Sequence, residues 1–76
     1  MSNQPLRTTN TMPPSEWPEH SLVRLRSATA DDHTVYPRGA LGTIVHIHRN
    51  GVAFEVEFSD PSPGVLTLEP SELEPE

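Results

Sequence analysis

Hydrophobic and polar residues alternate most clearly between Gly42 and Phe58. Two β-rich runs, residues 43–48 and 52–58, flank the dipeptide Asn50-Gly51. Asn-Gly between two such runs is the strongest short signal for a β-hairpin. If these two residues are the whole type I′ turn, His46 faces Glu55, and one side of the hairpin collects Val45, Ile47, Phe54, Val56 and Phe58. This register predicts a sheet with one buried face.

Shorter runs on either side predict further strands. Val23 and Leu25 alternate with arginines, and Leu66 and Leu68 alternate with a threonine, so both runs are typical of half-buried strands. The last run should pair with the strand before it. A single helical turn is then expected near Pro70, with an apolar residue behind it as an anchor. The predicted fold is all-β: a small SH3-like barrel of four or five short antiparallel strands with a terminal helical turn.

The N-terminal part of the chain shows neither the alternation of a strand nor the periodicity of a helix. Residues 1–19 hold four prolines among Ser, Thr and Asn, which predicts a disordered tail before a barrel over residues 20–76. Trp17 is the exception, because a lone tryptophan beside the first strand more often closes one end of a barrel than remains exposed to solvent. Gly39 and Gly42 are expected to serve a turn into the following strand.

Composition and charge exclude several classes of protein and of partner. A chain of 76 residues allows one small domain, and the absence of cysteine excludes a disulfide scaffold. No apolar run is long enough for a signal peptide or membrane span, so we expect a cytoplasmic protein. The net charge is -6, every base is an arginine, and no base follows Arg49. A negative surface over the last third repels phosphate backbones and argues against nucleic acid as a partner.

Candidate chemistry is sparse. His46 and His48 share a strand face with cross-strand Glu55, and such a set can bind zinc when geometry and a second shell hold it. Alternating polar residues on an exposed face look the same, so we expect no metal there. No cysteine and no serine in a glycine-flanked elbow is present for nucleophilic catalysis. We therefore expect no enzyme activity and no cofactor.

A resemblance adds to this interpretation. The segment Tyr36-Pro37-Arg38-Gly39-Ala40-Leu41-Gly42-Thr43-Ile44-Val45, the run Phe54-Glu55-Val56-Glu57-Phe58 and the later Leu66-Thr67-Leu68 resemble the small bacterial family called domain of unknown function 4926. The resemblance covers Leu22 to about Leu73 and implies an SH3-like barrel without an activity to transfer. The proline-rich tail is additional, and residues 60–64 are abbreviated.

Shorter likenesses leave alternatives open. The segment Gly42-Thr43-Ile44-Val45 after its turn is also similar to nucleic-acid-binding KOW segments and to the barrel of nitrile hydratase β subunits. Our main hypothesis is a non-enzymatic acidic module that binds another protein, with an antitoxin, immunity or accessory role. A KOW-like nucleic-acid binder and an accessory subunit of a metalloenzyme are the alternatives. So small a domain can also gain stability by associating with a second copy of the chain as a homo-oligomer.

The loop after the first strand is the predicted binding region. It carries an aromatic residue beside charges of both signs, a mixture that suits interfaces. The candidate partner-binding residues are Asp31, Asp32, His33, Tyr36 and Arg38.

Overall fold

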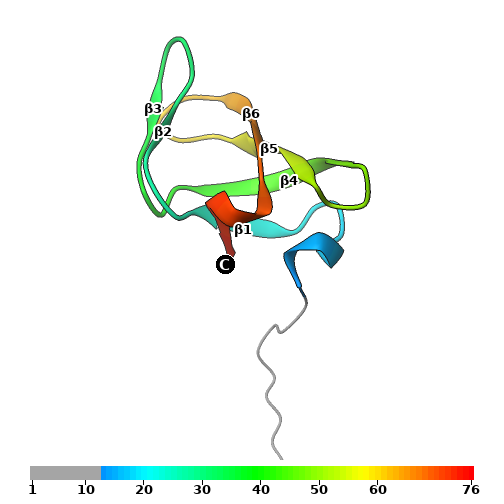
Figure 1. Ribbon diagram of the computed structural model, residues 1–76. Helices are drawn as coiled ribbons and strands as arrows, with labels where there is room; N and C mark the ends of the chain where they lie inside the picture. The colour runs from blue at the N-terminus through cyan, green and yellow to red at the C-terminus, as the bar shows by residue number, and fades with distance from the viewer. Residues whose placement is uncertain (1–12) are drawn as a thin grey trace, which may run out of the picture.

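The protein folds as a twisted antiparallel sheet with a smaller hairpin beside it (Figure 1). The computed structural model describes residues 13–76. In chain order the elements are η1 (Pro14–Glu16), β1 (Leu22–Leu25), β2 (Thr29–Ala30), β3 (Val35–Tyr36), β4 (Leu41–His48), β5 (Ala53–Phe58), β6 (Gly64–Leu68), η2 (Pro70–Glu72) and β7 (Leu73–Pro75). The main sheet has the order β6-β5-β4-β1-β7, and β2 pairs with β3.

The all-β prediction is confirmed. β1 pairs with both β4 and β7, and β6 pairs with β5 as expected. The short turn η2 precedes β7, and Leu73 behind it is fully buried, so the predicted anchor is present. The SH3-like arrangement remains our interpretation of this strand order. No helix within residues 13–76 has the length and apolar character needed to cross a membrane.

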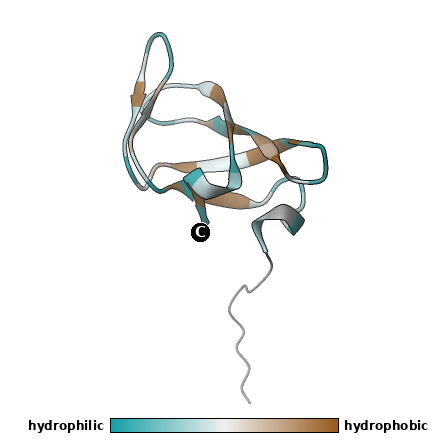
Figure 2. Cartoon of the chain, viewed as in Figure 1, coloured by the Kyte–Doolittle hydropathy of each residue, from teal (hydrophilic) through white to brown (hydrophobic). Residues whose placement is uncertain are grey.

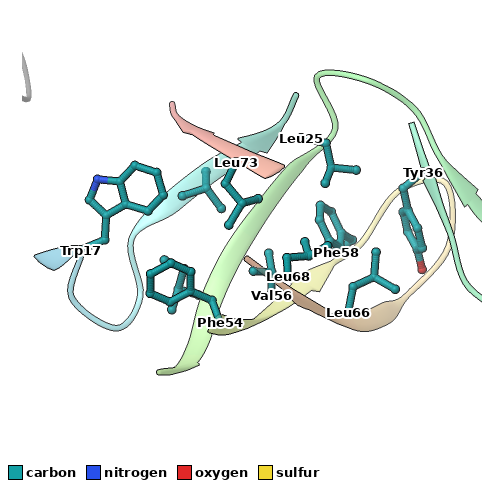
Figure 3. Packing of buried hydrophobic residues seen from close by; sticks show 11 residues of the cluster. Trp17, Leu25, Tyr36, Phe54, Val56, Phe58, Leu66, Leu68 and Leu73 are labelled. Carbon is teal, nitrogen blue, oxygen red and sulfur yellow. The ribbon is translucent and has the colours of Figure 1, made fainter. Parts of the chain in front are cut away.

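Hydrophobic residues recur along the strands (Figure 2), and their buried side chains form one continuous core (Figure 3). Phe54 contributes to one end of it and Phe58 to the other. The ring of Trp17 lies 6.0 Å from that of Phe54, and the ring of Tyr36 lies 4.9 Å from that of Phe58. The buried members are Trp17, Val23, Leu25, Tyr36, Ile44, Phe54, Val56, Phe58, Leu66, Leu68 and Leu73. Aromatic pairs at these distances add to the stabilisation from burial.

The segment around Trp17 packs on this core. Residues 1–12, most of the predicted tail, lie outside the described residues. From Pro13 onward the chain forms η1, and the side chain of Trp17 is only 4% exposed, as its expected place at one end of the barrel requires. Its indole Nε1 is buried without an acceptor among residues 13–76.

The β4–β5 register differs from the prediction at one residue. His48, Ile47 and His46 face their expected partners, and His46 lies opposite Glu55. A β-bulge then leaves Val45 unpaired, so that Ile44 faces Val56. Ile44 is fully buried and Val45 is 38% exposed, which makes the placement of Val45 in the core wrong. The extra residue turns the larger isoleucine inward.

The bulge also places Gly42 on the inner side of the sheet, opposite Phe58. A Cβ at Gly42 would lie 2.6 Å from a methyl carbon of Val56 and 2.8 Å from the ring of Phe58. Gly42 is therefore required by close packing of two strands, and not by a turn as expected. Gly39, with a φ of 85°, does serve the turn before β4.

The hairpin turn is shifted by one residue from the predicted one. The amides of Gly51 and Val52 both donate to the carbonyl of His48, at 2.9 and 3.1 Å. Arg49 and Asn50 are therefore the central residues of the turn, with φ of 44° and 61°, and Gly51 follows at 96°. The prediction of Asn50-Gly51 as the whole loop is wrong, whereas the positive φ of Gly51 is confirmed.

Candidate functional site

An open groove of about 370 Å³ lies on the outer face of β4 and β5. It is called the outer groove below. Its base is formed by Leu41 and Thr43 of β4 and Glu57 of β5, and Thr43 lies directly opposite Glu57 across the two strands. Its walls come from the turn before β4 and from the β5–β6 loop. The wall residues are Pro37, Ala40, Ser59, Asp60 and Pro61.

The groove combines apolar surface with two carboxylates. Leu41 is 41% exposed, and prolines stand on both walls. Glu57 and Asp60 add negative charge to this surface. Concave apolar surface with a few placed polar groups is the usual character of a binding site.

The two groove carboxylates differ from the other acids of the last third. Glu74 and Glu76 pair with Arg26 and Arg24, and Glu55 accepts hydrogen bonds. Glu69 and Glu72 form a capping box around η2. Within residues 13–76, Glu57 and Asp60 make no ion pair or side-chain hydrogen bond. Within residues 13–76, the negative charge of the outer groove is thus not balanced by an ion pair.

Arg24 of β1 and Arg26, which directly follows this strand, are used within the fold. Arg24 donates to the carbonyl of Gly39 at 2.9 Å, and Arg26 donates to that of Leu73 at 2.8 Å. Their guanidinium groups also lie 4.0 and 3.9 Å from Glu76 and Glu74. Exposed pairs of this kind contribute little to stability. Their effect on the surface is larger, because they neutralise positive charge that a phosphate backbone would need.

The tip of the β2–β3 hairpin carries three of the predicted partner-binding residues (Figure 1). Asp31, Asp32 and His33 are all exposed there. The Asp31 carboxylate accepts hydrogen bonds from the backbone amides of His33 and Thr34, at 2.8 and 2.7 Å. These amides hold the pKa of Asp31 below its ordinary value. Asp31 therefore shapes the tip, whereas Asp32 only presents charge.

Tyr36 has a different place from the one expected for a partner-binding residue. Its side chain is fully buried, and its hydroxyl donates to the carbonyl of Ser62 at 3.0 Å. The hydroxyls of Thr34 and Ser62 lie 3.1 Å apart. A Cβ at Gly64 would collide with the Tyr36 hydroxyl, so β6 approaches the hairpin closely. Tyr36 joins the β2–β3 hairpin to the β5–β6 loop and is not available to a partner.

Arg38 connects the two surfaces. It is exposed in the turn whose neighbours Pro37 and Ala40 line the outer groove. Ser62, which holds the β2–β3 hairpin through Tyr36, directly follows the opposite wall at Pro61. The predicted loop and the outer groove are therefore adjacent parts of one surface.

The metal candidates His46, His48 and Glu55 do come together. His48 Nε2 lies 2.7 Å from a carboxylate oxygen of Glu55, and the two imidazole rings lie 4.7 Å apart. Thr67 donates to the same oxygen at 2.9 Å. The bond to His48 and then that to Thr67 lower the pKa of Glu55. No set of three or more potential ligands in the described chain has a geometry for holding a metal ion.

No catalytic arrangement is visible in the described part of the chain. Among the serine and threonine side chains that the structure describes, which leave out Ser15, no hydroxyl forms a hydrogen bond with a histidine, an arrangement that would activate a nucleophile. The histidine contact that does form, between His48 and Glu55, is half-buried on a strand face, and neither residue lines the outer groove. The outer groove remains the feature with the character of a binding site.

Sequence reasoning missed Leu41, Glu57 and Asp60. The uninterrupted register placed Ile44 opposite Glu57, whereas the bulge places Thr43 there and leaves Leu41 on the outer face. One feature of the sequence could have indicated these residues: the dipeptide Asp60-Pro61, which forms a rigid turn at the end of β5.

Comparison with known proteins gives a family and no further relative. Residues 19–75 match the family model described as Domain of unknown function (DUF4926). No curated protein matches the chain, and no solved structure matches it.

Proposed function

The chain belongs to the DUF4926 family, a description that names no activity, and we propose that this protein is a non-enzymatic module that binds another protein. The outer groove carries this proposal. It offers apolar walls and two carboxylates that the fold leaves without partners, next to an exposed hairpin tip with further charge. Interfaces combine an apolar centre with charged residues at the edge in this way.

The distribution of charge supports a protein partner over nucleic acid. The net charge is -6, and Arg24 and Arg26 are engaged by backbone carbonyls and acids. A KOW-like binder of nucleic acid would need such arginines for phosphate contacts. We therefore retain that alternative only as an outcome of the experiment below.

The biological role follows from size and charge. A small acidic domain can cover a basic surface of another protein, as an antitoxin or immunity protein does, or serve as an accessory subunit. We place this activity in the cytoplasm. Both roles need binding and no chemistry from the chain itself.

The test is affinity purification of the full-length tagged protein from its native host, with and without nuclease. We expect a protein to co-purify in comparable amount to the bait, and nuclease to leave that recovery unchanged. Recovery of nucleic acid, or loss of the co-purified protein with nuclease, would support the KOW-like alternative and contradict our proposal.

A further inference from the structure

We propose that the outer groove receives one cationic side chain, arginine or lysine, carried by a partner segment with apolar residues beside it. This inference rests on the proposed function, since it specifies the partner of the same surface. The occupant is a segment of another protein and not a second copy of this chain.

Part of the groove surface is apolar. Pro37, Ala40 and Pro61 line the groove together with Leu41, which is exposed. Covering this surface removes apolar area from water, which is favourable in proportion to the area covered. A purely polar or fully charged segment leaves that contribution unused, so we expect aliphatic or proline side chains beside the cation.

The charge of the groove selects a cation. Glu57 and Asp60 both line it, and neither is paired within the described chain. A cation bound at this surface is attracted by both carboxylates and can donate charge-assisted hydrogen bonds to them. The hydroxyls of Thr43 and Ser59 line the same surface and can accept further donors.

Arg38 limits the number of cations. It is exposed in the turn that forms one wall, next to Pro37. A run of basic residues would bring a second cation toward this guanidinium, and like charges at an interface act against a wrong partner. A single cation flanked by apolar residues satisfies both the carboxylates and Arg38.

The chain itself contains a segment of similar chemistry. Arg49 and Val52 are both exposed at the β4–β5 turn. Insertion of this turn into the outer groove of another copy would bring together two molecules of net charge -6. Their mutual repulsion favours a different protein as the occupant.

The experiment is a selection of random heptapeptides displayed on phage against the full-length protein, followed by NMR titration with the best synthetic peptide. We expect selected sequences to share one arginine or lysine next to Leu, Ile, Val or Pro. The amide signals of Leu41, Thr43 and Glu57 should shift on binding. Replacing the basic residue by citrulline, which keeps the shape and removes the charge, should weaken binding at least tenfold.

Two variants complete the design. The double variant E57Q/D60N should lose at least tenfold in affinity, whereas E19Q, which removes an exposed carboxylate outside both the outer groove and the hairpin tip, should bind like the wild type. Unchanged thermal midpoints show that both are folded. No selected peptides, peptides without a base, or binding unaffected by E57Q/D60N would overturn the inference.

Failure of the inference is distinguishable from failure of the proposed function. If E57Q/D60N still co-purifies the partner found by affinity purification, the protein binds a partner but not through this groove. Sedimentation velocity covers the other occupant: a concentration-dependent dimer that is lost in E57Q/D60N would assign the groove to a second copy and overturn our choice.

Discussion

At the scale of single residues, the backbone of the β4–β5 turn has the strictest requirement. Three consecutive residues, Arg49, Asn50 and Gly51, have positive φ. Asn tolerates this region better than most residues, and Gly occupies it without steric cost. The turn thus concentrates conformations that most side chains avoid.

We expect Gly51→Val to destabilise the protein by about 1–3 kcal/mol, because a β-branched side chain is strained at a φ of 96°. Asn50→Gly is the matched control, and it should change stability by less than about 1 kcal/mol. Urea unfolding followed by circular dichroism measures both. Equal stability of Gly51→Val and the wild type would show that the turn has a different backbone.

Glu55 is, with Asp31, one of two carboxyl groups in the described chain whose lowered pKa makes stability depend on pH. Its pKa is lowered in the folded protein by the bonds from His48 and Thr67. A carboxyl with a lowered pKa contributes stability that is complete above the unfolded pKa and is lost as pH falls through the folded one. The loss therefore begins below about pH 4.3, the ordinary pKa of glutamate.

We expect the thermal midpoint of the wild type to fall more steeply below this pH than that of Glu55→Gln. Glu57→Gln is the control, because it removes a carboxylate on the same strand that makes no hydrogen bond among residues 13–76, and it should keep the slope of the wild type. Scanning calorimetry between pH 3 and 7 compares the three proteins. Parallel curves for the wild type and Glu55→Gln would contradict the role of the His48 contact.

At the scale of the elements, the bulge in β4 connects the core to the outer groove. It turns Ile44 inward and Val45 outward, and it brings Thr43 opposite Glu57. Without the bulge, the residues of the groove base would exchange faces, since side chains alternate along a strand. The groove and the core therefore depend on the same extra residue.

The matched substitutions Ile44→Ala and Val45→Ala test this bulge. We expect Ile44→Ala to cost about 2–5 kcal/mol, because a fully buried side chain leaves a cavity. Val45→Ala should cost less than about 1 kcal/mol, because Val45 is exposed. Chemical denaturation measures both. If Val45→Ala destabilised the protein more than Ile44→Ala, the uninterrupted register would be correct and the groove would lose its structural basis.

The strands and hairpin were predictable from sequence because their alternation is regular. Leu66 and Leu68 are buried as predicted, and His46 faces Glu55. The bulge was not predictable. Residues 43–45 are all β-branched, so the sequence pattern fits an inward-facing Ile44 as well as an inward-facing Val45. The position of the outer groove was not predictable either, because it depends on that register.

At the scale of the whole molecule, the acidic residues differ in whether they have partners within the fold. Acids near β1 and η2 are partnered within the fold, whereas Glu57 and Asp60 face the outer groove. The positive charge of Arg24 and Arg26 is neutralised by neighbours. The charge that remains at the outer groove is negative, and negative charge repels phosphate groups.

This balance predicts no saturable binding of duplex DNA or RNA at physiological salt. Fluorescence anisotropy with a labelled duplex of random sequence provides the measurement, and a basic domain of similar size is the positive control. A micromolar complex whose affinity falls steeply with salt would show that phosphate contacts exist on this surface.

The most direct measurement is reconstitution of the complex from two purified proteins. Isothermal titration calorimetry at physiological salt would use the co-purified partner, expressed alone, and the full-length chain. Our account predicts saturable binding with a defined stoichiometry and no requirement for nucleic acid, weakening as salt is raised because charge complementarity contributes. An absence of binding between the two pure proteins, or binding that appears only when nucleic acid is added, would contradict it.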